Sequence, residues 1–546
     1  MISESCASLS AVIATPTPFS IAASRSEIRD TFTARRSHCA AQSYYPIASG
    51  RGVRRSMTTP THLNGGGAPP ATLVSGRTAA VVLAAILTAS FMELLDATIV
   101  SVAAPAIAQD LGAGQAVLQW MLAGYTLSVG SGLITGGRIG DLYGRRRVFL
   151  LGLAAFMLAS AGCGLAQNPG ALIGMRVAQG LAGGLMIPQV FGIIRASFEP
   201  GARARALGAY GAVLGLASVA GPLLGGLLVE ADLFGLGWRA IFWVNVPIAI
   251  IALIVGARTM PESRSSGHTR LDLTGAVLAA IAAVLLLLPL MQGREWGWPW
   301  WGFAILALSV PVAALFLIRQ RRLVVRGAQP ILDPALLRVR AFAGGLSVSL
   351  LFFGALGSFF LLLSLYLQLG AGRTALETGL VILPYAIASI ITSGIGVRFA
   401  HRAGRALLFC GALLLAVSQI LLLLIVGDGA EPSYWGLATP LFVGGLGLGL
   451  TAPSLINVIL AGVPAKDAGA AGGVLTTLTQ IGNALGVAVL GVVFFTRLDD
   501  SLTDGASSLI AYGDALTAIL PWQVACYIAA AALMLLLPKH AQTPHE

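Results

Sequence analysis

Apolar segments long enough to cross a lipid bilayer follow one another almost without interruption from about residue 78 to residue 537. A spanning helix needs about 20 mostly apolar residues, and fourteen segments of this kind can be counted. They lie at residues 79–104, 116–136, 148–166, 170–194, 206–229, 239–257, 273–291, 301–318, 342–368, 376–397, 405–426, 435–459, 469–494 and 519–537. Only 10% of the residues are charged, against about 25% in soluble domains. The sequence therefore predicts an all-α integral membrane protein.

The arginines between these segments predict the orientation of the chain. They gather in alternate loops, whereas the other loops hold little more than Arg294 and Arg373. Basic loops face the cytoplasm, so we expect both chain termini to be cytoplasmic and the number of spans to be even. The formal net charge of +11 belongs to these membrane-surface loops, and it does not indicate a nucleic acid as partner.

A glycine-framed, arginine-rich loop recurs in weaker form later in the chain. Residues 137–147 read GRIGDLYGRRR, and residues 397–405 read VRFAHRAGR. Three positions match at the same spacing, namely Arg138, Gly144 and Arg145 in the first copy and Arg398, Gly404 and Arg405 in the second. The copies follow the second and the tenth predicted span, which favours two related halves of six spans separated by a two-span insert. Internal repeats of this kind are typical of secondary transporters.

The predicted organisation has five parts. They are a disordered tail at 1–77, a first half at 78–257, a two-helix insert with cytoplasmic linkers at 258–341, a second half at 342–537 and a cytoplasmic tail at 538–546. The Ser- and Arg-rich residues 1–56 allow three interpretations: a disordered tail, a start codon assigned too early with translation beginning at Met57, or a transit peptide.

Three charged residues lie well inside predicted spans, away from the span ends, where a charge is costly and therefore a functional candidate. Glu93 and Asp96 are three residues apart in the first span, which places them on one helix face. Burial and a like neighbour both make a carboxylate easier to protonate, as a proton carrier requires. Arg176 lies in the fourth span and needs an acid, a carbonyl or water as partner. The alternative for each residue is a purely structural role.

Two glycine motifs and a set of scattered polar residues complete the candidate site. The fifth span holds Gly215, Gly221, Pro222, Gly225 and Gly226, which we interpret as a close-packed bend beside a central cavity. In the first arginine-rich loop, Gly137, Arg138, Asp141, Gly144 and Arg145 are candidates for a latch, with Asp141 and Arg145 spaced as a pair at a helix start. The weaker candidates for a substrate cavity are Trp120, Tyr125, Gln368, Tyr385, Asn457, Gln480 and Asn483.

Other chemistries find no support in the sequence. The two lysines, Lys466 and Lys539, are not part of a phosphate-binding GxxxxGK[ST] loop, so any pumping must use an ion gradient or a separate ATPase subunit. The five cysteines are scattered, and the six histidines lie in predicted loops and tails. We therefore expect no metal, no cofactor and no enzymatic activity.

These motifs together resemble the major facilitator superfamily, and in particular its fourteen-helix branch of drug:proton antiporters. The resemblance covers about residues 78–537 and rests on the loop 137–147, on LIGMRVAQG at 172–180, on the fifth-span glycines, on LDATIVSVAAP at 95–105 and on WRAIFWVNVP at 238–247. Later family patterns fit around Gly379 and Gln480. Ser101 departs from the asparagine usual in the branch, Ala217 stands where glycine is frequent, and His401 replaces the acid of the second loop.

The resemblance implies a monomeric efflux pump in the cell membrane that exchanges protons for amphipathic, often cationic, drugs by alternating access. Asp96 with Glu93 and Arg176 would couple the protons, and Asp141 with Arg145 would latch the cytoplasmic side. Two alternatives remain open at this point. One is a dedicated exporter of a single natural product, and the other is a membrane scaffold or lipid-handling protein that does not pump.

Overall fold

The computed structural model describes residues 75–264, 272–328, 330–460, 468–535 and 537 of the chain. Residues 1–74 of the tail expected at 1–77 lie outside the described residues, and so does the whole tail expected at 538–546. The described helices belong to one compact unit, residues 66–546. The described elements are all helical, and most of the long helices are apolar enough to cross a membrane, which confirms the all-α membrane architecture expected from the sequence.

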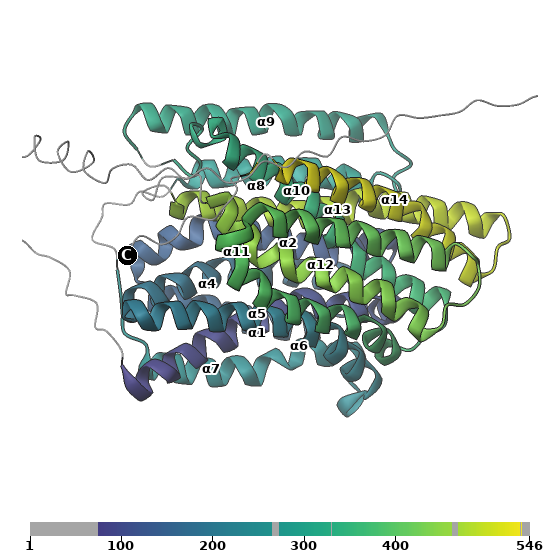
Figure 1. Ribbon diagram of the computed structural model, residues 1–546, viewed down its shortest axis with the longest axis horizontal. Helices are drawn as coiled ribbons and strands as arrows, with labels where there is room; N and C mark the ends of the chain where they lie inside the picture. The colour runs from purple at the N-terminus through teal and green to yellow at the C-terminus, as the bar shows by residue number, and fades with distance from the viewer. Residues whose placement is uncertain (1–74, 265–271, 329, 461–467, 536, 538–546) are drawn as a thin grey trace, which may run out of the picture. The chain divides into compact units, whose positions relative to one another are not determined.

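The chain begins with long helices joined by short turns (Figure 1). These are α1 (Gly76–Leu111), α2 (Gln115–Tyr143), α3 (Arg145–Gly164), α4 (Pro169–Ser197) and α5 (Pro200–Glu230). The short helices η1 (Leu233–Gly235), η2 (Gly237–Arg239) and α6 (Ala240–Trp243) then lead into α7 (Asn245–Thr259). We call α1 to α7 the first half.

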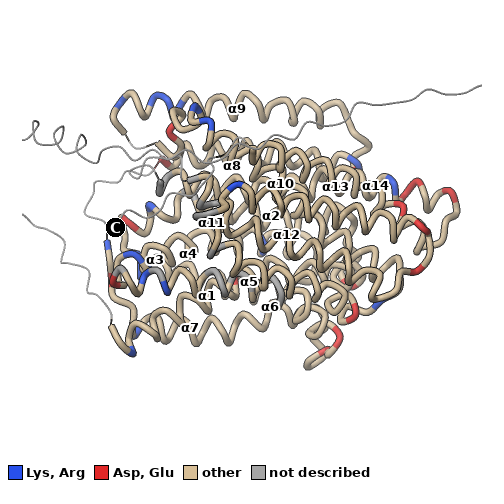
Figure 2. Tube along the Cα trace, in the orientation of Figure 1, with Lys and Arg blue, Asp and Glu red and all other residues tan. Residues whose placement is uncertain are grey.

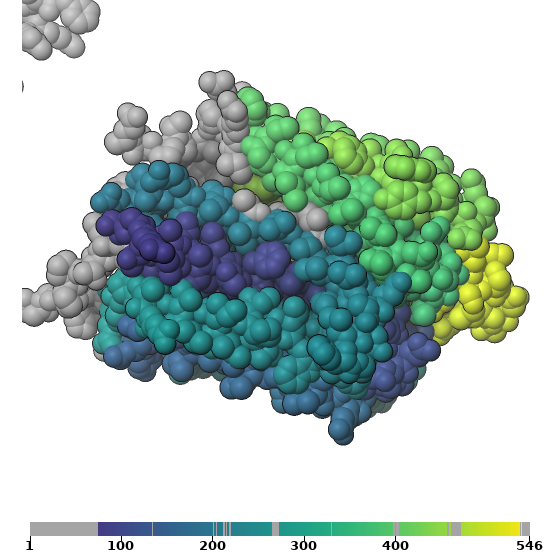
Figure 3. Space-filling model, turned by 90° about the horizontal axis from the view of Figure 1, so that it is seen from below, coloured from purple at the N-terminus to yellow at the C-terminus, as the bar shows by residue number. Residues whose placement is uncertain are grey.

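Two helices separate this part from the rest of the chain. They are α8 (Leu273–Gln292) and α9 (Trp300–Val325), which we call the insert. After η3 (Leu336–Arg338), the second half comprises α10 (Arg340–Leu365) with the π-helix η4 (Tyr366–Gly370), α11 (Ala375–Val426), α12 (Tyr434–Leu460), α13 (Ala468–Thr503) and α14 (Ser508–Met534). In Figure 3 the purple-to-teal first half and the green-to-yellow second half occupy separate regions of one face.

Each of the fourteen predicted segments overlaps one of these helices, with two differences in detail. The tenth and eleventh spans form a single long helix, α11, which breaks at Gly404 (φ 26°, ψ −109°), a backbone conformation that favours glycine. The last helix begins at Ser508 rather than near residue 519. By length and composition, twelve helical segments of the described chain could cross a membrane, or thirteen if the two bent parts of α2 count as one span.

Packing follows the same pattern in both halves. In the first half α1 packs against α5 and α7, α2 against α4, and α3 against α4 and α7. In the second half α10 packs against α13 and α14, and the two arms of α11 supply the contacts with α12 and α14. The halves meet where α5 packs against α11 and where α2 packs against α13. In the repeat, α2 corresponds to the first arm of α11 and α5 corresponds to α13, so these two contacts are equivalent to each other.

Basic and acidic residues gather at opposite ends of the helices, as the positions of the loop arginines in the sequence predict. The α2–α3 turn with its arginines lies at one end, where Figure 2 shows most of the blue segments. We call this the arginine-rich end. The α1–α2 turn and the start of α11 lie at the opposite end, where Asp and Glu are more frequent (Figure 2).

Candidate functional site

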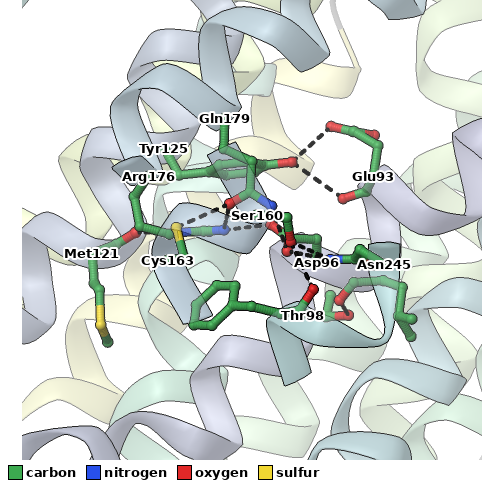
Figure 4. A network of polar contacts seen from close by, with 12 residues as sticks. Glu93, Asp96, Thr98, Met121, Tyr125, Ser160, Cys163, Arg176, Gln179 and Asn245 are labelled. Carbon is green, nitrogen blue, oxygen red and sulfur yellow. Dashed lines mark hydrogen bonds and ion pairs between the residues drawn. The ribbon is translucent and has the colours of Figure 1, made fainter. Parts of the chain in front are cut away.

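The centre of the first half holds a buried ion pair between Asp96 of α1 and Arg176 of α4 (Figure 4). The Asp96 side chain is 0% exposed and that of Arg176 is 1% exposed. The second carboxylate oxygen accepts hydrogen bonds from the Gln179 amide (2.9 Å) and the Asn245 amide (3.0 Å). Both oxygens of this acid are therefore satisfied without water, as a charge in an apolar bundle requires.

The Arg176 guanidinium is held on several sides. It donates to the Gln179 side-chain oxygen (2.8 Å) and to the Met121 carbonyl (3.2 Å). Its carbon atom lies 4.0 Å from the ring centroid of Tyr125, a cation–π contact. One nitrogen, Nη2, has no partner among the described residues. Arg176 thus joins α1, α2 and α4 at a single charged point.

Two members of this network were not among the residues singled out from the sequence. Gln179 lies one helix turn after Arg176, and Asn245 begins α7 and also donates to the Ser160 hydroxyl (3.0 Å). Ser160 in turn donates to the Phe242 carbonyl (2.9 Å). Both amides stand inside the motif strings that carried the family resemblance, and this was the available signal. Hydropathy alone gave no reason to select a neutral amide.

Glu93 has different surroundings from Asp96, although both lie on α1. Its side chain is buried, and it accepts a long hydrogen bond of 3.4 Å from the Tyr125 hydroxyl. The same hydroxyl also donates to the Glu93 carbonyl (3.2 Å). The expected proximity of the two acids is present, but Asp96 is bonded to the arginine whereas Glu93 is bonded to a phenol. Tyr125, predicted as a cavity residue, is therefore part of the charged network.

The fifth-span glycines lie against two different partners. A Cβ at Gly221 would collide with the Thr98 hydroxyl of α1, and one at Gly225 would lie 2.9 Å from the Ile99 carbonyl. A Cβ at Gly226 would instead collide with the Ala375 carbonyl of α11 in the second half. Pro222 is buried in the same stretch of α5, and its carbonyl faces Gly379 of α11. Gly215 lies in α5, but its surroundings are outside the described residues.

The arginine-rich loop is built largely from contacts within the first half. Asp141 lies in the last turn of α2 and Arg145 begins α3, so their ion pair (2.8 Å) bridges two helices and is not the pair within one helix start that the spacing suggested. Gly144 connects them with φ 106°, which favours glycine. Arg145 also donates to the Gly192 carbonyl of α4 (3.4 Å). Gly137 lies against Pro188 of that helix.

A second acid supports this loop. Glu262, which follows α7, accepts from the backbone nitrogen of Arg146 (3.2 Å) and lies near the Arg147 side chain. Arg138 points elsewhere and donates to the Pro330 carbonyl, between α9 and α10. The sequence did not single out Glu262, because an acid in a loop has no distinguishing pattern. Among the described residues, the contacts of the predicted latch lie in the first half and in the linker after α9.

The remaining cavity candidates lie in separate places. Trp120 is partly buried in the core, and Gln368 donates to the Val102 carbonyl of α1 (2.9 Å). Gln480 lies beside Gly130 where α13 meets α2, and its oxygen accepts from Asn483 (3.4 Å). Tyr385 packs against Phe360 in the second half, with ring centroids 5.2 Å apart. Asn457 lies in α12, but its side chain is outside the described residues.

Comparison with known proteins identifies the family. The model of the Major Facilitator Superfamily matches residues 86–273 and 271–487. The chain belongs to the major facilitator superfamily. It is accordingly a multi-pass transporter of the cell membrane, and the Asp96–Arg176 network lies in the interior of its first half.

Several curated relatives of this transporter are similar along most of their length. The chain is 39% identical over 431 residues to the probable actinorhodin transporter of Streptomyces coelicolor, covering 78% of this chain and 75% of the relative. It is 35% identical over 457 residues to the tetracenomycin C resistance and export protein of Streptomyces glaucescens, covering 82% of each. It is 33% identical over 424 residues to the multidrug resistance protein Stp of Mycobacterium tuberculosis, covering 76% and 75%.

Solved structures support the same fold. An auto-inhibited peptide transporter of the POT family matches with a TM-score of 0.60 at 17% identity, covering 84% of this chain and 96% of that one. A bacterial homologue of the lysosomal transporter Spinster, in an inward-facing and occupied conformation, matches with a TM-score of 0.55 at 16% identity, covering 85% and 97%. At these identities the likeness concerns the fold alone.

Proposed function

We propose that this transporter is a proton-driven antiporter that exports amphipathic small molecules. It would have fourteen spans arranged as six, two and six, with both termini in the cytoplasm. The observation that carries the proposal is the pair of buried carboxylates on α1, one of them bonded to a buried arginine. Such groups are expensive inside a membrane and are retained where charge must change during the transport cycle.

The fourteenth span in this proposal is α5. Its 31 residues are long enough to cross the bilayer, and residues 206–229 within it carry no charge. Its glycines pack it closely against α1 on one side and α11 on the other, which supports a position in the centre of the membrane. With α5 included, arginine-rich and arginine-poor loops alternate throughout, which would place the arginine-rich loops on one side of the membrane, as the positive-inside rule requires.

Protonation of Asp96 would give the first half two arrangements. With the carboxylate charged, it holds Arg176, Gln179 and Asn245 together, as in this structure. A proton on Asp96 removes the charge that pairs with Arg176, so the guanidinium must find other acceptors and α1 is released from α4. Glu93 accepts from the hydroxyl of Tyr125, whose ring also stacks on Arg176, so it would share in this proton exchange.

The latch residues would act at the cytoplasmic side of the same cycle. The Asp141–Arg145 pair holds the end of α2 to the start of α3 and to α4, so the arginine-rich ends of these helices move as one body. A rigid first half of this kind supports rocking against the second half, which is how alternating access works in transporters with repeated halves.

The decisive test uses proteoliposomes that contain a pH-sensitive dye. Ethidium is added under an imposed pH gradient to the wild type, to Asp96→Asn and to Asp110→Asn. Asp110 is a matched control, because it also lies on α1 but pairs with Arg239 at the opposite end from the arginine-rich loops. We expect ethidium-dependent proton flux in the wild type and in Asp110→Asn, and flux at background level in Asp96→Asn. Exchange at the wild-type rate in Asp96→Asn would overturn the assignment of the proton to Asp96.

A second candidate is an exporter dedicated to one natural product. The relatives named for actinorhodin, tetracenomycin C and cephamycin export support it, whereas those named for multidrug resistance support the broader function. A panel of unrelated toxic compounds separates the two. Protection of cells against many of them favours multidrug export, and protection against one favours a dedicated pump. A scaffold that does not pump would give neither protection nor proton flux.

A further inference from the structure

The end of the insert that lies opposite the arginine-rich loops contacts both halves of the transporter. Helix α8 packs against α2 of the first half and against α13 of the second. Directly after α8, a turn carries two oppositely charged neighbours, Arg294 and Glu295. Each of them bonds to a different half.

Glu295 bonds to the first half. Its carboxylate accepts a hydrogen bond of 3.1 Å from the backbone nitrogen of Ala116, in the first turn of α2. An acid at this position satisfies one of the free N–H groups at a helix start and complements the helix dipole. Glu295 therefore fixes this end of α2 to the insert.

Arg294 bonds to the second half through an ion pair with Asp499, near the end of α13. Asp499 also lies 3.4 Å from the Gln115 side-chain nitrogen, at the start of α2. Just below, the buried side chain of Gln119 lies against Gly491 of α13. The ends of α2 and α13 are thus in direct contact, and the turn after α8 bonds to both.

We propose that Arg294 and Glu295 form an extracellular latch that holds the two halves together on the outer side of the membrane. The proposal rests on the proposed function in two respects, namely that this end of the helices faces the outside and that the halves rock apart during transport. Because the two residues are neighbours in the chain, they cannot stay bonded to α2 and α13 once these helices separate. Outward opening must break one of the two contacts, and the Arg294–Asp499 pair is the one that crosses to the second half.

The other end of the insert is attached differently. Asp272, at the start of α8, accepts from Arg319 (2.7 Å) and from Gln320 (2.8 Å) of α9. Burial acts to raise the pKa of this acid, but these hydrogen bonds outweigh it and hold the pKa below its ordinary value. Gln320 also accepts from the Ile331 nitrogen (2.7 Å), beside the Pro330 carbonyl to which Arg138 of α2 donates. The insert is therefore bonded to α2 at both ends, and we infer that it moves with the first half, so that Arg294–Asp499 is a contact between moving bodies.

The test measures opening of the outer seam directly. A cysteine is introduced at Gln119 in a protein without its native cysteines, and its labelling by a membrane-impermeant maleimide is followed from outside. We expect Arg294→Ala to raise the labelling rate about two- to fivefold, as expected for loss of a partly exposed ion pair. The charge exchange Arg294→Asp with Asp499→Arg should return the rate toward that of the parent.

The chain offers a matched control on the same side of the membrane. Arg373 and Glu431 form an ion pair of 3.4 Å within the second half, so Arg373→Ala removes a similar pair that does not cross the seam. Equal labelling in Arg294→Ala and the parent, or an equal increase in Arg373→Ala, would overturn the latch. Hydrogen–deuterium exchange of residues 115–119 in the protein with its native cysteines and Gln119 gives the same comparison, should the introduced cysteine disturb folding.

These measurements do not depend on transport. Faster labelling in Arg294→Ala without any proton flux in the wild type would retain the latch and reject antiport. Proton flux in the wild type with unchanged labelling in Arg294→Ala would retain antiport and reject the latch.

Discussion

The two halves of this transporter hold a buried tyrosine in the same way. In the first half, a Cβ at Gly180 of α4 would collide with the Tyr125 carbonyl of α2. In the second half, a Cβ at Gly445 of α12 would collide with the Tyr385 carbonyl of α11. Both tyrosines are almost fully buried. The repeat seen in the arginine-rich loops therefore extends to a specific helix contact in the interior.

The chemistry around the two tyrosines differs. Arg176 stands four residues before Gly180, and the fully buried Leu441 stands four residues before Gly445. The Tyr125 ring lies 4.0 Å below the Arg176 guanidinium, whereas the Tyr385 ring packs against Phe360 with centroids 5.2 Å apart. Among the described residues, the buried charged side chains within spanning helices lie in α1 and α4.

Packing and charge are therefore separable in this fold. Close helix contacts through glycine are repeated because both halves need the same backbone geometry. The buried ion pair is not repeated among the described residues of the second half, and a second one would add the desolvation energy of two more buried charges.

The largest effect on stability and transport is expected from replacing Arg176 of the first half by leucine, the residue at the matching position of the second half. Arg176→Leu leaves Asp96 as an uncompensated buried charge, which typically costs about 3–5 kcal/mol. We expect a large fall in thermal stability in detergent, measured by the unfolding temperature, together with loss of proton flux. The double variant Arg176→Leu with Asp96→Leu removes both charges and should recover most of the stability but none of the flux. A double variant as unstable as the single one would mean that packing, not charge, dominates at this site.

A smaller effect tests the shared scaffold. Gly180→Ala and Gly445→Ala each place a methyl group against a backbone carbonyl, and overpacking of this kind costs about 1–3 kcal/mol. We expect the two variants to lose similar amounts of stability. Proton flux per folded molecule should fall more in Gly180→Ala, because the displaced Tyr125 supports Arg176 and Glu93. Equal loss of flux in both would indicate that the tyrosine contacts matter for folding alone.

The smallest effect distinguishes the two phenol hydroxyls. Tyr125→Phe removes the hydrogen bonds to Glu93 and should cost about 0.5–1.5 kcal/mol. The Tyr385 hydroxyl has no partner among the described residues, so Tyr385→Phe should leave the stability unchanged or raise it slightly. The unfolding temperatures of the two variants provide the measurement. A clear loss of stability in Tyr385→Phe would reveal a partner for that hydroxyl and weaken the contrast between the halves.

Much of the candidate site could be predicted from the sequence, because charge inside an apolar segment is conspicuous. Asp96, Glu93 and Arg176 were found in this way. Gln179 and Asn245 were not, since a neutral amide costs little in a hydropathy profile and its partner lies 83 or 149 residues away. The start of α14 was misplaced for a related reason. Asp514 lowers the local hydropathy, but Ser501 donates to it (3.0 Å), so the helix extends through this acid.

The membrane class, the helical segments, the repeat and the family could all be predicted from the chain, because hydropathy, loop charge and local motifs are properties of a linear pattern. The packing of the helices was needed to show that Asp96 pairs with Arg176 while Glu93 bonds to Tyr125, and that Arg138 and Glu295 connect the insert to α2. These choices depend on which helix faces are brought together. Such contacts join residues far apart in the chain. They form only in the packed bundle, because helix packing selects which partner lies close enough to each buried polar side chain.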